Sequence, residues 1–406
     1  MHASDSIELQ ISLLLFCAMA GYLLASYIRQ PAVVGQILLG IIIGPSVLGL
    51  VSYTTLVSNL AHIGAIVLLF VVGLEFRLKD ILQWRYMVIG LFGVFFPLIG
   101  GVLLARAFGF ESAKAIFLGI CLTATSIAIT ADTLRETGQL NSNIAKAIIG
   151  AAIIDDILAL LALSVGSQYI EGTVSLGNSL FFLAKGIAFF VVGAWIGQRY
   201  ISRLLVVIDN SQLGRKYTEL AFIAAMMLAF LFAIAAELVG LSAIIGAFVA
   251  GVALEGIKLQ YSKDFKEGAE FVRILFAAIF FVSLGVLLDV SALDRHLLGF
   301  LAAITVFALL SKIIGCGLPA RFLGYDNRES LAIGIGMAPR GEVSMVIALL
   351  GLNLGIIEQP LYVVIVLMSV LTTLVTPPAL RALMSGDNAT SNTEQPSDHQ
   401  PASRKK

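Results

Sequence analysis

The sequence predicts an all-α membrane protein with about thirteen transmembrane helices, and three observations lead to this fold class. Hydrophobic residues make up 59% of the 406 residues and charged residues only 13%. The mean hydropathy is +0.96, which fits lipid as the solvent, because a soluble domain of this size needs more charge on its surface. Apolar runs of about 20 residues, the length that crosses a bilayer, recur along the whole chain.

Each expected helix is one such apolar run, bounded by polar residues, glycine or proline. The helices are expected at residues 7–28, 31–50, 56–76, 86–107, 112–134, 143–166, 176–201, 217–236, 240–256, 272–289, 296–321, 328–354 and 359–384. Residues 1–384 would then form one transmembrane domain. The polar stretch 385–406 has no large apolar residue and is expected to be a disordered cytoplasmic tail.

The basic residues indicate how these helices are oriented. Twenty of the 26 lysines and arginines follow odd-numbered helices, whereas Arg106, Lys114 and Arg295 lie on the other side. Cytoplasmic segments carry the excess of positive charge, so we expect a multi-pass protein of the cell (inner or plasma) membrane. Its N-terminus would be outside and its C-terminus in the cytoplasm. The formal net charge of zero argues against a nucleic-acid partner.

An internal repeat is indicated by residues that match at one offset. Gly73 maps onto Gly285 at an offset of 212, and Thr125 maps onto Met337 beside a second apparent helix break. This shift carries each helix onto the seventh helix after it, and since seven is odd, the two halves must be inverted. We therefore expect two six-helix inverted repeats joined by a linker helix, with crossed discontinuous helices 5 and 12 near the midplane.

Two adjacent carboxylates, Asp155 and Asp156, lie midway along the sixth expected helix, with mainly apolar residues on both sides. A charge at the bilayer centre costs about 2.5–3.5 kcal/mol on insertion scales, so such residues are rare unless they are functional. Neighbours on a helix point about 100° apart and cannot face the same partner. Carboxylate oxygens bind small cations and also protons. Competition of the two ions for one carboxylate would produce exchange.

Lys312 is the basic residue in the middle of the eleventh helix. A lysine buried alone would lose its charge, so we expect a carboxylate partner, and one member of the aspartate pair is the natural candidate.

The two expected helix breaks carry further candidates. Pro339, with Arg340 and Glu342 beside it, interrupts helix 12, because proline removes a backbone donor. Arg340 is expected to satisfy freed carbonyls of the first half-helix of that pair, and Glu342 to face the positive N-terminus of the second. The break in helix 5 offers hydroxyls and carbonyls as cation ligands. The candidates there are Thr123, Thr125 and Ser126.

These motifs resemble the monovalent cation:proton antiporter-2 family. The resemblance rests on the stretch 123–126, on Asp155-Asp156, on Pro339 to Glu342, and on 31–45, and it covers about residues 7–384. It implies a thirteen-helix homodimer in which scaffold helices at about 7–76 and 217–289 support core helices at about 86–166 and 296–384. Residues 176–201 would form the linker helix.

The resemblance also implies roles for the charged residues. Asp156 would be the main cation and proton carboxylate, with Asp155 paired to Lys312. An aspartate pair points to the electrogenic branch of such antiporters, in which two protons enter for each cation expelled. The family's potassium-efflux members often carry a nucleotide-binding domain, which does not follow helix 13 here, so sodium, and also lithium, is expected as the cation.

We therefore expect a secondary antiporter that exchanges a monovalent cation for protons by alternating access and serves pH homeostasis. Potassium/proton exchange, or sodium-coupled symport of an organic anion, would use the same fold. A cation channel would need a selectivity-filter loop, and none is visible. Walker loops, metal-ligand clusters and nucleophile elbows are likewise missing from the sequence, so we expect neither an enzyme nor a resident cofactor.

Overall fold

The computed structural model describes residues 6–75, 83–139, 142–170, 176–262 and 265–384, and in these the chain is helical, with no β-strand. The all-α class expected from composition is confirmed. The expected disordered tail, 385–406, lies outside the described residues. The helices are α1 Ile7–Tyr27, α2 Ala32–Ile43, α3 Thr55–Glu75, α5 Trp84–Ala107, α6 Ser112–Cys121, α7 Ile127–Glu136, α8 Asn143–Ile170, α9 Leu176–Ile196, α10 Ser202–Asn210, α11 Gln212–Lys216, α12 Leu220–Leu238, α13 Ala243–Leu254, α14 Phe265–Leu287, α15 Arg295–Phe322, α16 Asn327–Gly336, α17 Glu342–Asn353 and α18 Gln359–Met384.

Eight helices within the described ranges are long and apolar enough to cross a membrane, and shorter apolar helices accompany them. The second and ninth expected helices are among the short ones, α2 and α13. Gly44 and Pro45 end α2, and α13 lies between Gly240 and Gly256, which adopt positive φ angles of 76° and 72°. The multi-pass character is confirmed, while the number thirteen stays a prediction.

The outer surface of the helices is apolar, as lipid contact requires. Large hydrophobic side chains on four helices are half or more exposed, among them Phe16 (60%), Leu103 (65%), Met227 (55%) and Val306 (56%). Exposed apolar surface on this scale would be unfavourable in water and is favourable against acyl chains. The chain therefore folds as a membrane protein.

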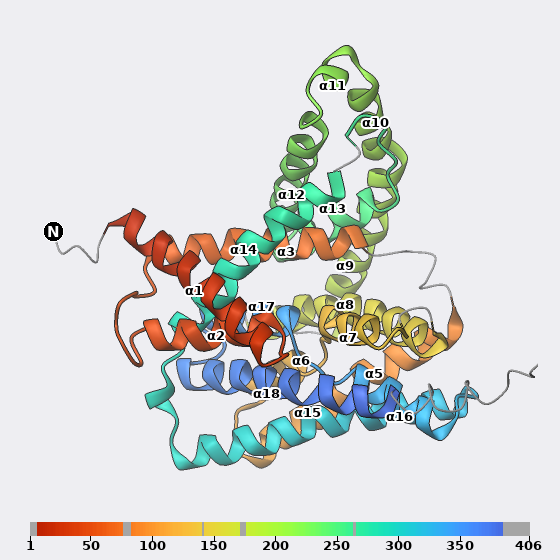
Figure 1. The fold of residues 1–406 in the computed structure, drawn as a ribbon. Helices are drawn as coiled ribbons and strands as arrows, with labels where there is room; N and C mark the ends of the chain where they lie inside the picture. Colours follow the sequence, from red (N-terminus) through yellow and green to blue (C-terminus); the bar gives the residue numbers. More distant parts are fainter. Residues whose placement is uncertain (1–5, 76–82, 140–141, 171–175, 263–264, 385–406) are drawn as a thin grey trace, which may run out of the picture.

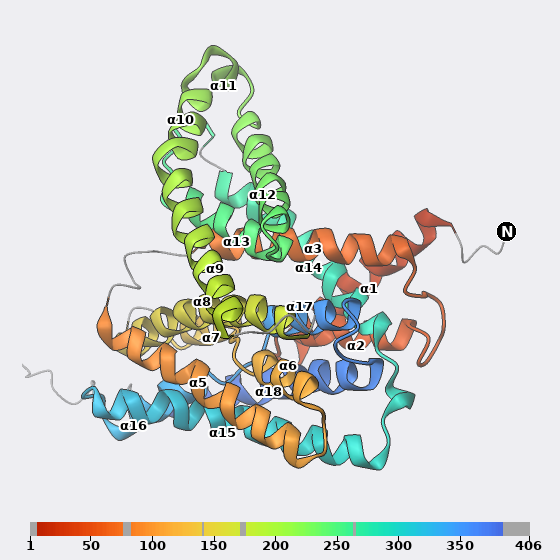
Figure 2. The same cartoon turned by 180° about the vertical axis from the view of Figure 1, so that it is seen from behind.

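The helices form two groups, and most of the helix packing lies within each group. One group, which we call the upper group, contains α1, α2, α3, α12, α13 and α14, which pack on one another; in Figure 1 α3, α12, α13 and α14 lie above α8, whereas α2 reaches down to the level of α7. The lower group contains α5 to α8 and α15 to α18, and Figure 2 shows α5 and α15 side by side at its base. We keep the names upper group and lower group for these two sets.

Two helix crossings in the upper group depend on glycine and match at nearly one offset. A Cβ on Gly40 of α2 would overlap the carbonyl oxygen of Val282 of α14, next to Gly285. A Cβ on Gly251 of α13 would overlap the carbonyl oxygen of Phe70 of α3, next to Gly73. Such close backbone approach is the usual reason for small residues where membrane helices cross. The α2–α14 and α13–α3 crossings thus have equivalent geometry.

A long helix connects the two groups and extends beyond the expected linker. The predicted helix 176–201 continues through a π-helical turn, Gly197–Ile201, into α10. The buried carboxylate of Asp209 near its end accepts backbone hydrogen bonds from Gln260, Tyr261 and Ser262 at 2.6, 3.1 and 2.9 Å. Capping of the α13–α14 connection by Asp209 fixes the far end of this helix to the upper group.

Substitution at a crossing glycine tests this packing. We expect Gly73→Ala to lower the melting temperature of the detergent-purified protein, because its methyl group would overlap the backbone of Phe248. Overpacking of this kind costs about 1–3 kcal/mol. Gly299→Ala is the matched control, since a Cβ at this exposed position in α15 meets no atom within 4 Å. Equal melting temperatures for the two variants would contradict the described crossing.

Candidate functional site

Two helix breaks face each other inside the lower group. One lies between α6 and α7, the other between α16 and α17, and their residues from Thr123 to Ser126 and from Met337 to Gly341 are buried. The two breaks bond to each other: the N–H of Ser126 donates to the carbonyl of Pro339 at 2.9 Å. Gly341 permits this contact, because a Cβ there would lie 2.5 Å from Oγ of Ser126. The backbone groups freed by one break are thus partly satisfied by the other.

Arg340 is fully buried and stabilises the break of the opposite helix pair. Its guanidinium donates to the carbonyls of Thr123 (3.2 Å) and Ala124 (2.9 Å) beyond α6, and to that of Ala308 (3.3 Å) in α15. The sequence suggested carbonyls of Arg340's own half-helix. The structure differs because the two breaks cross, which brings the end of α6 closer to the guanidinium.

A buried ion pair lies beside this crossing. Nζ of Lys312 in α15 is 2.7 Å from both Oδ1 and Oδ2 of Asp155 in α8, and both side chains have 0% exposure. The hydroxyl of Thr125 lies 2.6 Å from Oδ2 of Asp155 and 3.2 Å from the carbonyl of Met337. Asp155 therefore accepts three close contacts from α15 and from the first break, which hold its carboxylate in one position.

Asp156 is the second carboxylate at this place and is 2% exposed. Because it follows Asp155 in α8, its side chain leaves the helix about 100° further around the axis. The described buried charges here are Asp155, Asp156, Lys312 and Arg340, which balance when both aspartates are ionised. A single added cation or proton therefore changes the charge of the site by the same amount.

The other predicted residues have local roles in the structure. The hydroxyl of Thr123 donates to the carbonyl of Ile120 at 2.7 Å and so caps the end of α6. Glu342 is the first residue of α17, and its side chain lies outside the described part of the chain. Groups of three or more His, Cys, Asp or Glu that could hold a metal ion are missing from the described residues.

Sequence reasoning missed several polar residues around the crossing. Thr130 donates to the carbonyl of Gly336 at 2.6 Å, and Ser344 to that of Ala124 at 3.3 Å. Thr372 accepts the N–H of Arg340, and Thr373 donates to its carbonyl. The adjacent threonines of α18 were a usable signal, because two neighbouring hydroxyls in an apolar helix need partners.

Gly93 of α5 provides the space in which the ion pair packs. A Cβ at this position would lie 2.7 Å from Sγ of Cys316, and 3.6 Å from both Oδ1 of Asp155 and Nζ of Lys312. Cys316 is one turn beyond Lys312 in α15 and is itself buried. The ion pair is thus enclosed by α5, α8 and α15.

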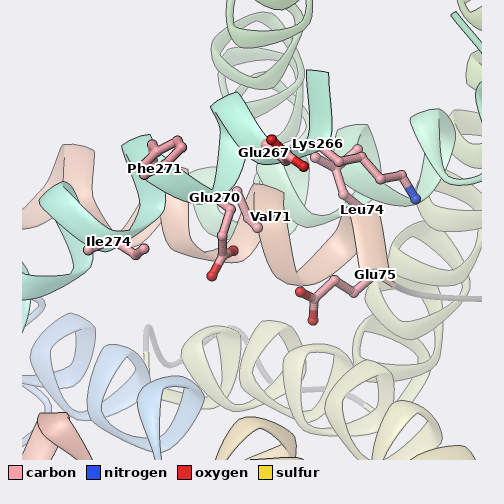
Figure 3. Close-up of a pocket in the computed structure, with 8 residues that line it drawn as sticks. All are labelled: Val71, Leu74, Glu75, Lys266, Glu267, Glu270, Phe271 and Ile274. Atoms are coloured by element: carbon pink, nitrogen blue, oxygen red, sulfur yellow. The ribbon is translucent and has the colours of Figure 1, made fainter. Parts of the chain in front are cut away.

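Two cavities lie near the boundary between the groups. The larger, of about 850 Å³, is lined by α1, α2 and α14 of the upper group and by α7 and α18 of the lower group. The smaller, of about 390 Å³, lies between α3 and α14. Figure 3 shows Glu75 and Glu270 pointing from these two helices toward the lower group. The larger cavity reaches α7, the half-helix that begins at the first break.

Comparison with known proteins decides the family. The model of the family "Sodium/hydrogen exchanger, transmembrane" matches residues 11–386. The chain belongs to the sodium/hydrogen exchanger family. The resemblance to cation:proton antiporters that the motifs suggested is confirmed, and the chain is a transporter rather than an enzyme.

Curated relatives cover nearly the whole of this exchanger. The Na⁺/H⁺-K⁺ antiporter GerN of Bacillus cereus is 34% identical over 376 residues, which are 92% of this chain and 95% of GerN. The high-affinity Na⁺/H⁺ antiporter NhaS3 of Synechocystis sp. is 34% identical over 350 residues, 84% of this chain and 74% of NhaS3.

A solved structure shows the same fold. The sodium proton antiporter MjNhaP1 from Methanocaldococcus jannaschii, determined at pH 8, superposes with a TM-score of 0.72 at 18% identity. The superposition covers 94% of this exchanger and 98% of MjNhaP1.

The enclosure of the ion pair in this exchanger is testable at Gly93. We expect Gly93→Ala to lower both thermal stability and exchange rate, because the new methyl group displaces Cys316 and presses on the pair. The double variant Gly93→Ala/Cys316→Ala removes the displaced sulfur and should recover most of both properties. Cys316→Ala alone controls for the loss of the thiol. If the double variant loses as much stability and exchange rate as Gly93→Ala, the close packing of Gly93 against Cys316 does not explain the effect.

Proposed function

We propose that the chain exchanges Na⁺, and also Li⁺, for protons across the cell membrane, with Asp156 as the carboxylate that binds either ion. The observation that carries this assignment is the close engagement of Asp155 by Lys312 and Thr125. A carboxylate held by an ammonium at 2.7 Å and a hydroxyl at 2.6 Å is poorly placed to bind a further cation. Asp156 is the next residue of α8, and its side chain leaves the helix about 100° further around the axis.

Mutual exclusion at Asp156 would couple the two ions. A protonated carboxyl has lost the charge that attracts a cation, and a bound cation in turn favours loss of the proton. Because Na⁺ and H⁺ carry the same charge, either one leaves the buried site with the same net charge. Oxygens of Thr123, Thr125 and Ser126 at the first break are the proposed additional cation ligands, since alkali cations prefer hard oxygen donors.

An exchange of two protons per cation is electrogenic and requires a second proton site. In this proposal the Asp155–Lys312 pair supplies it, because these are the other titratable groups that bond to each other at the crossing. Release of one proton from Asp156 and one from the pair, against one bound cation, would move one net charge per cycle. The membrane potential would then drive cation efflux.

Alternating access would move the lower group as a core against the upper group as a dimer scaffold. The core is residues 86–166 and 296–384, the scaffold 7–76 and 217–289, with 176–201 as linker. The cavity between the groups supports this division. The matched crossings of Gly40 with Gly285 and of Gly251 with Gly73 support the inverted repeat. The homodimer, the thirteen spans and the outside N-terminus belong to the same proposal.

Potassium/proton exchange is the second candidate, because the relative GerN is named as a Na⁺/H⁺-K⁺ antiporter. Proton flux measured in proteoliposomes against Na⁺, Li⁺ and K⁺ in turn separates the two candidates. Flux that responds to K⁺ and not to Na⁺ would favour this second function.

The ion carboxylate is tested by Asp156→Asn, which keeps the size of the side chain and removes its charge. We expect cation-driven proton flux in proteoliposomes to fall to the level of empty vesicles, with the fold preserved. Asp209→Asn is a control for loss of a buried carboxylate elsewhere, and there stability rather than the ion site should change. Normal flux from Asp156→Asn would refute the assignment.

The role of the ion pair is tested by removing it one partner at a time and then together. Asp155→Asn or Lys312→Met alone leaves a buried charge without its partner, which typically costs about 3–5 kcal/mol. The double variant removes both charges and should regain stability while losing one proton site. We expect its exchange to respond less to an imposed membrane potential than that of the unmodified protein. An unchanged voltage response would exclude the pair as the second proton site.

A further inference from the structure

The larger cavity is unusual for a cation pathway because its charged lining is basic. Among the described residues that line it are Arg29 after α1, Arg273 of α14 and Arg381 of α18, and none is Asp or Glu. Arg273 forms two hydrogen bonds with Glu270 on its own helix, one of them 2.7 Å long. The carboxylate of Glu270 lines the neighbouring cavity instead (Figure 3).

The three guanidinium groups lie around the cavity, and although Glu270 balances the charge of Arg273, the described lining residues keep an excess of positive charge, which raises the electrostatic potential inside the cavity. Clefts with low-dielectric walls focus such potentials, so the lining disfavours the transported cation and favours an anion. Arginine is also the side chain best suited to phosphate, because its planar donors form two parallel hydrogen bonds. The lining therefore indicates a bound anion with several oxygens.

The turn between α1 and α2 adds neutral polar groups to the same cavity. Arg29 adopts a positive φ of 54°, and the turn is closed by bonds from its N–H to Ser26 and from the N–H of Gln30 to Ala25. Ser26, Gln30 and Tyr22 all line the cavity. Oε1 of Gln30 is buried and accepts no hydrogen bond from the described residues. A ligand that carries hydroxyls as well as a phosphate could use both this acceptor and the arginines.

The cavity reaches an exposed side of α1 at Tyr22. Tyr22, which lines the cavity, is 57% exposed, and Tyr27 and Ile28 nearby are 88% and 50% exposed. Aromatic residues at helix ends favour the headgroup region of a bilayer. We infer that this cavity binds an anionic phosphate group, presented either by a phospholipid headgroup or by a free phosphate in solution, through Arg29, Arg273 and Arg381.

Such a ligand would bridge the two helix groups. Arg29 and Arg273 belong to the upper group, whereas Arg381 belongs to the lower group on α18 (Figure 1). If alternating access moves the two groups, which rests on the proposed function, a bridging anion stabilises the state in which this cavity is open. The bound phosphate would then slow the cycle and make the exchange rate depend on anionic lipid.

The experiment compares the unmodified chain, Arg29→Gln/Arg381→Gln and the control Arg203→Gln, an exposed arginine on α10 outside the cavity. Native mass spectrometry of the purified proteins measures how much phosphatidylglycerol each retains. A second arm replaces the lipid with inorganic phosphate and measures thermal stabilisation. We expect the double variant to bind about tenfold or more weakly than the other two, the effect of losing one or two charge-assisted contacts.

Equal retention by all three proteins would overturn the proposal. Stabilisation by phosphate alone assigns the site to a soluble anion, and retention of lipid alone assigns it to a headgroup. The melting temperature without ligand verifies folding, and Arg29→Gln alone replaces the double variant if that one fails to fold. Asp156→Asn should bind the phosphate group normally, so a failure of the proposed transport site remains distinguishable from a failure of this one. In zwitterionic vesicles the double variant and the unmodified chain should exchange at equal rates.

Discussion

The buried pair of Lys312 and Asp155 is the interaction on which the arrangement of the site depends. It joins α15 to α8 at 2.7 Å with both side chains fully buried, and the hydroxyl of Thr125 joins the first helix break to the same carboxylate. An ion pair in this setting stabilises little by itself, because desolvation offsets much of the attraction. Its consequence is specificity, because it commits Asp155 to two defined partners, Lys312 and Thr125.

The helix crossing depends on a second buried charge. Arg340 lies after the break in one helix pair and donates to carbonyls freed by the break in the other. Without a hydrogen-bond donor, each freed carbonyl in the hydrocarbon region would destabilise the fold by roughly several kcal/mol. The fixed guanidinium allows irregular backbone to exist where lipid supplies no water. The two breaks and the ion pair therefore form one connected unit.

Much of this could be predicted from sequence, because membrane burial makes each charge informative. Asp155, Asp156, Lys312 and Arg340 were identifiable as charges within apolar runs. The carbonyls of Thr123 and Ala124 that Arg340 binds were not predictable, because they lie 217 and 216 residues away and depend on how the helices cross. The role of Gly93 was hidden for the same reason. The extension of the linker into α10 was missed because polar residues ended the apolar run while the helix continued.

We propose that Asp156, rather than Asp155, is the carboxylate that binds the cation in exchange for a proton, while Asp155 stays with Lys312. Titration of purified protein with Na⁺ in weakly buffered solution, with the released protons recorded beside the heat of binding, tests it most directly. We expect that Na⁺ binding releases protons, that Asp156→Asn shows neither binding nor release, and that Asp155→Asn still binds Na⁺. Na⁺ binding without proton release, or binding that survives Asp156→Asn, would contradict it.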